Sequence, residues 1–172
     1  MVILMRSEYV LEQKLLQALD LLTDGNRLVM RVCLATGLRL GDVLALRTRQ
    51  LAPQFYITEA KTGKRRRVNL PGQLLVDLRE QAGEEWVFPG AKPGKHRTRQ
   101  AVWKDLKRAA KALRIDRNLT PHSARKAYAV RLMEKYGEID RVRRALNHDN
   151  EAVTVIYALA DRLPERNRRR SK

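Results

Sequence analysis

Early in the chain, the sequence reads Ala35-Thr-Gly-Leu-Arg-Leu-Gly-Asp-Val-Leu-Ala-Leu-Arg47. Residues 26–36, which run into this stretch, are mostly apolar, as expected of a buried helix. Gly37 ends that helix, because glycine tolerates the left-handed conformation in which helices commonly terminate. A second short helix is expected over residues 40–46. Arg39 is therefore predicted to lie at the junction between two helices.

The segments on either side predict a mixed fold. Residues 7–22 carry valine and leucine at helical spacing, which predicts a first helix. From residue 54 to residue 70 the pattern changes to short alternating runs separated by Lys61-Thr-Gly-Lys64, and the glycine in this four-residue polar connection marks a β-hairpin. A helix is expected from residue 74 to about 81, and the proline, glycine and basic residues of 89–97 predict an exposed loop.

The second half of the chain is expected to be helical. A basic amphipathic helix is predicted from about Arg99 to Leu113. Thr120-Pro121 marks the start of another helix, because threonine caps helices and proline tolerates the first helical position. Two short helices are expected over about 138–146 and 151–159. We therefore predict one mostly α domain with a small antiparallel β-sheet (α+β), spanning 1–161, and a basic C-terminal tail over 162–172.

The charge balance indicates a polyanionic partner. Lysine and arginine number 36 against 19 aspartate and glutamate, which gives a net charge of +17 and a pI near 10.8. Nucleic acid is the first candidate. A basic membrane-surface protein would carry similar charge, but the sequence has no long apolar run, and its opening residues are too short for a signal peptide. We expect a cytoplasmic protein.

The use of cysteine and of carboxylates excludes several kinds of site. Cys33 is the single cysteine, which excludes intramolecular disulfides and thiolate zinc sites, and its apolar neighbours indicate core packing. Carboxylates are scattered, and Glu84-Glu85 is the only adjacent acidic pair, so the sequence lacks the acidic cluster of a two-metal nuclease. We expect neither a metal nor a cofactor.

Six residues could together attack a phosphodiester without a metal: Arg39, Lys61, His122, Arg125, His148 and Tyr157. Tyr157 offers a phenolic oxygen whose pKa near ~10 makes it a better nucleophile and leaving group than a serine hydroxyl. Arg39 and Arg125 can each bind non-bridging phosphate oxygens in a bidentate manner, which lysine cannot do.

The remaining three residues can move or share protons. Lys61, on the hairpin turn, can protonate the leaving oxygen, while His122 can accept the tyrosine proton and His148 can donate to a phosphate oxygen. His122 shares a helix face with Arg125, three residues on.

Nine residues of unbroken helix would separate His148 from Tyr157 by about 13 Å. Asp149-Asn150 is therefore expected to cap a new helix after His148.

Each of these residues has an ordinary explanation when it is taken alone. Tyr157 lies near Val153 and Ile156 and could be a core aromatic, and Lys61 and Lys64 could be solvated hairpin residues. The charge could equally belong to a ribosome-associated or other nucleic-acid-binding protein. The combination of six residues of suitable type in one order, with two tight spacings, favours the catalytic interpretation over these explanations taken together.

Four stretches give the chain a resemblance to the catalytic domain of the tyrosine recombinases, the phage integrase family. They are Ala35–Arg47, Lys61–Lys64, Thr120-Pro-His-Ser-Ala-Arg-Lys126, and Leu146-Asn-His-Asp149 with the step to Tyr157. The resemblance implies that the family's site residues are Arg39, Lys61, His122, Arg125, His148 and the nucleophile Tyr157, with Asp42 as an orienting acidic residue.

The resemblance also implies an activity and partners. Family members form a 3′-phosphotyrosyl intermediate and a free 5′ hydroxyl without a metal or cofactor. They exchange strands of double-stranded DNA through a Holliday junction in a homo-tetramer. We expect a site-specific recombinase that is monomeric alone and acts near the nucleoid of a bacterium or phage-infected host, with a role in mobile elements. The segment after Tyr157 is expected to pack on a neighbouring protomer.

Three features depart from the family pattern. Ala124 and Asn147 replace residues common at those positions, but neither change removes a catalytic group. Most members carry an N-terminal helical DNA-binding domain, and the short segment before Arg39 leaves no room for one. We expect that domain to be absent, as in a natural minimal recombinase or an excised fragment.

Further basic residues are expected to contact DNA: Lys64, Arg65, Arg66, Lys95, Arg97, Arg99 and Lys104. His96 is expected in solvent or near a phosphate.

Two alternatives to a recombinase remain. A type IB topoisomerase uses the same residue types, although the Leu146-Asn-His-Asp149 box and its spacing to Tyr157 favour a recombinase. A non-catalytic DNA-binding module is the other, and the intact set of catalytic residues argues against it.

Overall fold

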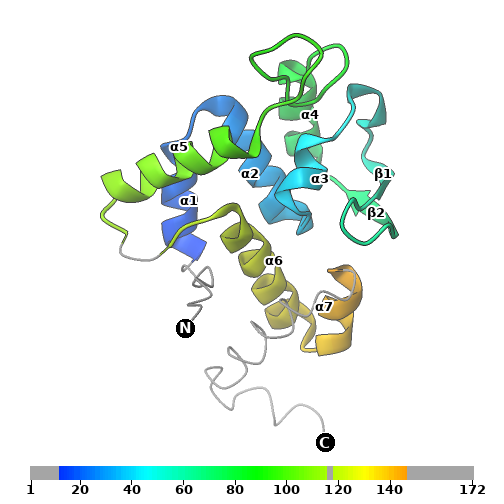
Figure 1. Ribbon diagram of the computed structural model, residues 1–172. Coiled ribbons are helices and arrows are strands. Elements are labelled where there is room, and N and C mark those ends of the chain that lie inside the picture. Colours follow the sequence, from blue (N-terminus) through cyan, green and yellow to red (C-terminus); the bar gives the residue numbers. More distant parts are fainter. Residues whose placement is uncertain (1–11, 116–117, 147–172) are drawn as a thin grey trace, which may run out of the picture.

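The computed structural model describes residues 12–115 and 118–146. Its elements in chain order are α1 (Glu12–Asp20), α2 (Asp24–Thr36), α3 (Leu40–Leu44), the 3₁₀ helix η1 (Thr48–Gln50), β1 (Gln54–Thr58), β2 (Arg65–Asn69), α4 (Gly72–Gln81), α5 (Arg99–Ala112), α6 (Pro121–Tyr136) and α7 (Ile139–Ala145). Figure 1 shows the hairpin on one side of the helices and α5 on the other. The predicted class, mostly helical with a small antiparallel sheet, is confirmed.

Helix α2 lies at the centre of the fold. It contacts α1, α3, α4, α5 and α6. Its residues Val29, Met30, Val32 and Cys33 have no exposed surface, and burying each large apolar side chain contributes about 1.5–3 kcal/mol. Burial raises the pKa of the Cys33 thiol to about 12. The prediction that Cys33 is a core residue is confirmed.

The bend between α2 and α3 has the expected glycine. Gly37 has φ +66° and its N–H donates to the carbonyl of Cys33 at 2.8 Å. A Cβ at residue 37 would lie 2.3 Å from Cδ1 of Tyr128 on α6. The glycine is thus needed both for the left-handed turn and for the close approach of α6. Arg39 follows in an extended conformation, with φ −71° and ψ 146°, immediately before α3.

The hairpin pairs β1 with β2 in antiparallel register, from Gln54 opposite Asn69 to Thr58 opposite Arg65. Phe55, Ile57 and Val68 face the core. The connection comprises residues 59–64 and is longer than the predicted four residues. Within it, the N–H of Glu59 donates to the carbonyl of Lys64 at 3.0 Å, and the N–H of Gly63 donates back to the carbonyl of Glu59 at 2.8 Å.

Helix α5 is fixed to the α1–α2 turn by a buried carboxylate. Oδ2 of Asp105 accepts hydrogen bonds from the N–H of Thr23 at 2.9 Å and from Nδ2 of Asn26 at 2.8 Å. Arg108, one turn further along α5, donates to Oδ1. Burial alone would raise the pKa of Asp105, but the hydrogen bonds from Asn26, Thr23 and Arg108 outweigh it and lower the pKa to about 2.

Helix α6 begins at Pro121 with Thr120 as its N-cap residue, as predicted, but the threonine side chain makes no capping hydrogen bond. The hydroxyl of Thr120 is buried without a hydrogen-bond partner in the described residues. The side chain of Ser123 instead accepts the backbone N–H of Thr120 at 3.2 Å. At the other end of α6, Gly137 ends the helix with φ +68°. Val142 and Leu146 then pack on Ala129, which seats α7 against α6.

Several predicted segments extend beyond the described residues. The helix expected over 7–22 is seen as α1 from Glu12 onward, and the helix expected over 151–159 and the tail over 162–172 lie outside the described part. Among the described helices, none is long and apolar enough to cross a membrane.

Candidate active site

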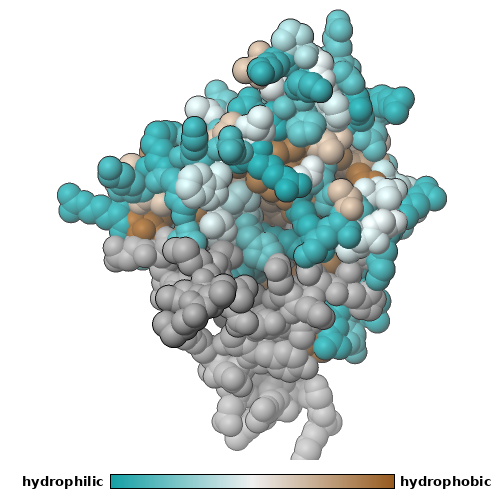
Figure 2. All heavy atoms as spheres, in the orientation of Figure 1, coloured by the Kyte–Doolittle hydropathy of each residue, from teal (hydrophilic) through white to brown (hydrophobic). Residues whose placement is uncertain are grey.

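A basic pocket forms where the α2–α3 bend, the hairpin turn and the start of α6 meet. Its volume is about 540 Å³, and five of its lining residues are basic: Arg39, Lys61, Arg99, His122 and Arg125. The other lining residues are Leu38, Leu40, Gly41, Ala60 and Pro121, so no described lining residue is acidic. Hydrophilic side chains cover most of the described surface on the face drawn in Figure 2. A pocket of this charge suits an anion such as a phosphodiester.

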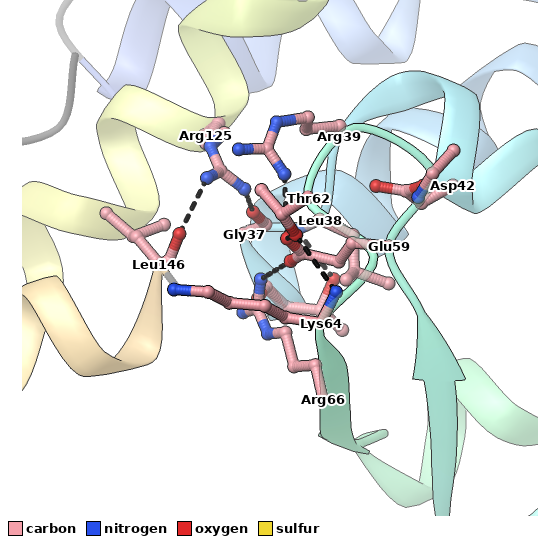
Figure 3. Close-up of polar contacts among 12 residues, drawn as sticks. Gly37, Leu38, Arg39, Asp42, Glu59, Thr62, Lys64, Arg66, Arg125 and Leu146 are labelled. Atoms are coloured by element: carbon pink, nitrogen blue, oxygen red, sulfur yellow. Dashed lines mark hydrogen bonds and ion pairs between the residues drawn. The ribbon is translucent and has the colours of Figure 1, made fainter. Parts of the chain in front are cut away.

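Arg39 reaches the pocket from the α2–α3 bend. Its Nη1 donates to Oε2 of Glu59 at 2.8 Å, and 17% of its side chain is exposed. The contact joins the bend to the first residue after β1, as Figure 3 shows. The guanidinium is therefore held by a carboxylate on one side and lines the pocket on another.

Arg125 is the most deeply buried of the three arginines that line the pocket, with 4% of the residue exposed. It lies in the first turns of α6 and donates from Nη1 to the carbonyl of Gly37 and from Nη2 to the carbonyl of Leu146 at 3.0 Å. Both contacts are drawn in Figure 3. His122, three residues earlier, is half-buried and lines the same pocket. The predicted shared face of His122 and Arg125 is confirmed.

Lys61 lies on the hairpin turn, exposed to solvent and at the pocket wall. The backbone N–H of Ala60, the residue before it, donates to Oδ1 of Asp42 at 2.9 Å. Asp42 is 8% exposed, and its Oδ2 has no hydrogen-bond partner among the described residues. In this structure Asp42 therefore orients the backbone that carries Lys61.

Four of the six predicted catalytic residues thus line one pocket. His148 and Tyr157 lie outside the described residues. The described residues also hold no group of three or more histidine, cysteine or acidic side chains arranged to bind a metal ion.

Comparison with known proteins shows the family of the chain that forms this pocket. The sequence model described as the phage integrase family matches residues 9–162, nearly the whole chain. The chain belongs to the phage integrase family.

Two curated relatives illustrate how far the family likeness extends. A putative integrase/recombinase of Sinorhizobium fredii is 31% identical over 136 residues, which are 75% of this chain and 44% of that protein. The tyrosine recombinase XerD of Lacticaseibacillus casei is 30% identical over 144 residues, 77% of this chain and 49% of that protein. The chain spans about half the length of these relatives.

The fold is also similar to that of a solved structure. It matches the XerH site-specific recombinase, in a post-cleavage complex with a palindromic difH substrate, with a TM-score of 0.71 at 21% identity. The match covers 92% of this chain and 52% of that one. It therefore supports a phage integrase fold for the α-helices and hairpin described above.

Five of the basic residues predicted to contact DNA in this phage integrase chain are on the surface. They are Lys64, Arg65, Lys95, Arg99 and Lys104. Arg65 and Lys64 project from the hairpin, and Arg65 lies over the ring of Tyr56 with its Cζ 4.2 Å from the ring centroid. Arg99 begins α5 and lines the pocket.

Arg66 and Arg97, which were also predicted to contact DNA, are less exposed and bind protein groups in this structure. Nη1 of Arg66 is 3.2 Å from Oε1 of Glu59, its Nη2 donates to the carbonyl of Thr36, and 11% of its side chain is exposed. Arg97 is half-buried and donates to Oδ1 of Asn26 at 3.1 Å. Strand alternation explains Arg66, because it faces inward beside Val68.

His96 is likewise held by the protein. Its ring meets that of Trp86 edge to face, with centroids 5.0 Å apart, and its Nδ1 lies 2.7 Å from the carbonyl of Arg97. The residue is half-buried, so its ring is only partly in solvent, and its expected place near a phosphate stays a prediction. It helps to close the 89–97 loop, in which the N–H of Gly90 donates to the carbonyl of Lys95 at 2.8 Å.

Glu59, which has no exposed surface, was not among the residues predicted for the site. The alternation of inward-facing residues in the sequence could have predicted that Glu59 is buried. Phe55 and Ile57 face inward on β1, and Glu59, directly after the strand, continues the same alternation, which places its carboxylate on the inward face. A charged residue in an inward position needs partners, and two arginines provide them.

Proposed function

We propose that this chain cleaves and rejoins double-stranded DNA as a site-specific recombinase, through a covalent 3′-phosphotyrosyl intermediate and without a metal. The observation that carries the proposal is the meeting of Arg39, Lys61, His122 and Arg125 in one basic pocket. These residues come from three segments of the chain that only the fold brings together. Membership of the phage integrase family supports the same conclusion.

In the proposed reaction, Tyr157 attacks the scissile phosphorus through its phenolic oxygen. The bond from phosphorus to the 5′ oxygen breaks, its electron pair stays on that oxygen, and Lys61 supplies the proton that makes a 5′ hydroxyl. His122 accepts the tyrosine proton. The step is reversible, because a 5′ hydroxyl of another strand can attack the phosphotyrosine and release the phenol.

Arg39 and Arg125 replace a metal ion as the electrostatic clamp in this proposal. The phosphorane gains negative charge on its non-bridging oxygens, and planar guanidiniums bind such oxygens in pairs. Both side chains are held by protein oxygens, so little reorganisation is needed when the charge develops. His148 completes the clamp as a hydrogen-bond donor.

The proposal includes the partners and the place of action. Residues 1–161 act as the catalytic domain on double-stranded DNA, as a monomer alone and a homo-tetramer on synapsed DNA, in the cytoplasm at the nucleoid. The basic tail over 162–172 packs on a neighbouring protomer. Its removal should weaken assembly on synapsed DNA more than single-site cleavage, and an equal loss of both would contradict a role in assembly.

Trapping of a covalent protein–DNA adduct tests the proposed chemistry. The protein is incubated in EDTA with a pool of nicked duplexes, quenched in detergent, and compared with Tyr157→Phe. Tyr56→Phe is a matched control, because Tyr56 is 49% exposed on the hairpin surface. We expect an adduct for the wild type and for Tyr56→Phe, and none for Tyr157→Phe.

Other outcomes separate the alternatives. An adduct that survives Tyr157→Phe would contradict the assigned nucleophile. Relaxation of supercoiled DNA without sequence preference would favour a type IB topoisomerase. Salt-sensitive DNA binding with no adduct on any duplex would indicate a non-catalytic binding module.

A further inference from the structure

The carboxylate of Glu59 is the best-protected charge in the described part of the chain. The residue is 0% exposed, and a buried carboxylate is costly unless cations and hydrogen-bond donors surround it. Oε2 accepts from Nη1 of Arg39 at 2.8 Å, and Oε1 lies 3.2 Å from Nη1 of Arg66. A buried ion pair can be purely structural. Whether Glu59 also has a role in the site depends on which other groups its carboxylate binds.

The same carboxylate oxygen that binds Arg39 also binds the hairpin turn. The hydroxyl of Thr62 donates to Oε2 of Glu59 at 3.1 Å. Thr62 is the residue directly after Lys61. The turn around Lys61 is therefore tied to the oxygen that holds the pocket arginine, as Figure 3 shows for Thr62, Glu59 and Arg39.

A second carboxylate holds the other side of Lys61. The N–H of Ala60 donates to Oδ1 of Asp42, and Asp42 lies in α3, which Arg39 precedes. Both neighbours of Lys61 are thus bound by carboxylates that belong to, or contact, the Arg39 segment. Meanwhile Arg66 links the other oxygen of Glu59 to the carbonyl of Thr36 at the end of α2.

This arrangement matters because Arg39 and Lys61 act on different oxygens of one phosphate in the proposed reaction. Errors of about 1 Å in such groups can cost about 100-fold in rate. Lys61 lies on an exposed turn, and turns are more mobile than the elements they connect. A bond network that runs from the arginine to both neighbours of the lysine restricts their relative movement.

We propose that Glu59 is a positioning residue of the strand-transfer site, which aims the Arg39 guanidinium into the pocket and sets the distance between Arg39 and Lys61. Glu59 does not touch the DNA itself. The inference rests on the proposed recombinase function, and it adds a residue that acts through two others.

Chemically altered substrates separate this role from a general effect on folding. A methylphosphonate at the scissile position lacks one non-bridging charge and so depends less on Arg39. A bridging 5′-phosphorothiolate has a leaving sulfur that needs no protonation and so depends less on Lys61. A merely structural defect would slow all three substrates equally.

We expect Glu59→Gln to lower the rate of adduct formation on the natural phosphodiester by about 10- to 100-fold. The deficit should shrink on each altered substrate, while duplex binding changes by less than about threefold. Thr62→Val keeps both arginine contacts of Glu59 and removes the two contacts of the threonine hydroxyl within the turn, with Glu59 and with the N–H of Lys64. Its deficit should shrink on the phosphorothiolate and persist on the methylphosphonate.

Asp77→Asn provides the matched control, because it breaks a different carboxylate–arginine pair, with Arg31, outside the pocket. It should leave all three rates unchanged. If Glu59→Gln fails to fold, Thr62→Val and Glu59→Asp carry the test, and Glu59→Asp should recover part of the rate because it retains a carboxylate.

The two possible failures are distinguishable. Wild-type protein that forms no adduct on any substrate would overturn the proposed function. Wild-type protein that forms an adduct, with folded Glu59→Gln or Thr62→Val equally impaired on all three substrates or not impaired at all, would overturn the positioning role alone.

Discussion

The guanidinium of Arg125 donates a hydrogen bond to the carbonyl oxygen of Gly37, 88 residues earlier in the chain. Gly37 is the left-handed residue that ends α2, and Arg39 follows two residues later. One arginine of the pocket is thus hydrogen-bonded to the backbone turn that presents a second one, Arg39. The stability of the bend and the shape of the anion site depend on the same contact.

Arg125→Lys should impair both folding and cleavage. Lysine cannot reach the carbonyls of Gly37 and Leu146 together, and we expect the free energy of unfolding to fall by about 2–4 kcal/mol. Adduct formation should fall by about 100-fold or more, because the bidentate phosphate contact is lost. Urea denaturation and adduct trapping measure the two effects.

Arg131→Lys is the matched control for that variant. Arg131 lies on the same helix and also donates to a backbone carbonyl, that of Leu34, but it does not line the pocket. It should lower stability and leave cleavage by the folded protein close to wild type. Equal cleavage defects in Arg125→Lys and Arg131→Lys would contradict a phosphate contact by Arg125.

Gly37→Ala should be far more damaging than Gly137→Ala, although both residues end helices with φ near +67°. A Cβ at residue 137 meets nothing within 4 Å, so its cost is the left-handed strain of about 1–2 kcal/mol. At residue 37 the Cβ also collides with the ring of Tyr128, which adds about 1–3 kcal/mol. Urea denaturation of the two variants should show this gap, and equal losses would mean that α6 shifts away from the bend at no cost.

Asp105→Asn should destabilise the protein in a pH-dependent manner. The carboxyl has a pKa of about 2 in the folded protein, below its ordinary value of 3.8, so its ionised form contributes about 2 kcal/mol to stability near neutral pH. That contribution is complete above pH ~4 and is lost as the pH falls towards 2. Urea denaturation of wild type and variant should therefore converge in acid.

Asp140→Asn serves as the control for the acid experiment. Asp140 pairs with Arg143 on the surface and 70% of its side chain is exposed. Its replacement should not change the free energy of unfolding measurably at either pH. A constant difference between wild type and Asp105→Asn from pH 7 to pH 2 would show that the ionised carboxylate is not the stabilising group.

Arg65→Gln and Arg66→Gln should affect different properties, although the two residues are adjacent on β2. Arg65 faces solvent, so its loss should make the slope of log K for DNA binding against log salt concentration shallower by about one unit. Arg66 faces Glu59 and the carbonyl of Thr36. Its loss should reduce stability and leave the slope unchanged. Fluorescence anisotropy of a labelled duplex at several salt concentrations measures the slope, and equal slopes for both variants would contradict this assignment.

Local signals predicted the elements that shape the pocket. Gly37 acts through its left-handed backbone conformation, and Pro121 acts through its fixed φ and its missing N–H. Both effects reach only about one helical turn, so they can be predicted without knowing the fold. The Lys61–Lys64 turn was predicted for the same reason. Thr120 was predicted at the capping position in the same way, but side-chain packing decides whether its hydroxyl makes the capping hydrogen bond, and here that hydroxyl is buried without a partner among the described residues.

By itself, the sequence determined the order of helices and hairpin, the basic character of the chain and the residue types of the candidate site. Tertiary structure decided which charges meet. Arg66 and Arg97 turned inward although their neighbours Arg65 and Lys95 are exposed, and Glu59 became the buried partner of Arg39. The physical reason is that local conformation depends on a few neighbouring residues, whereas the cost of a buried charge is offset only by partners that the fold brings from elsewhere in the chain.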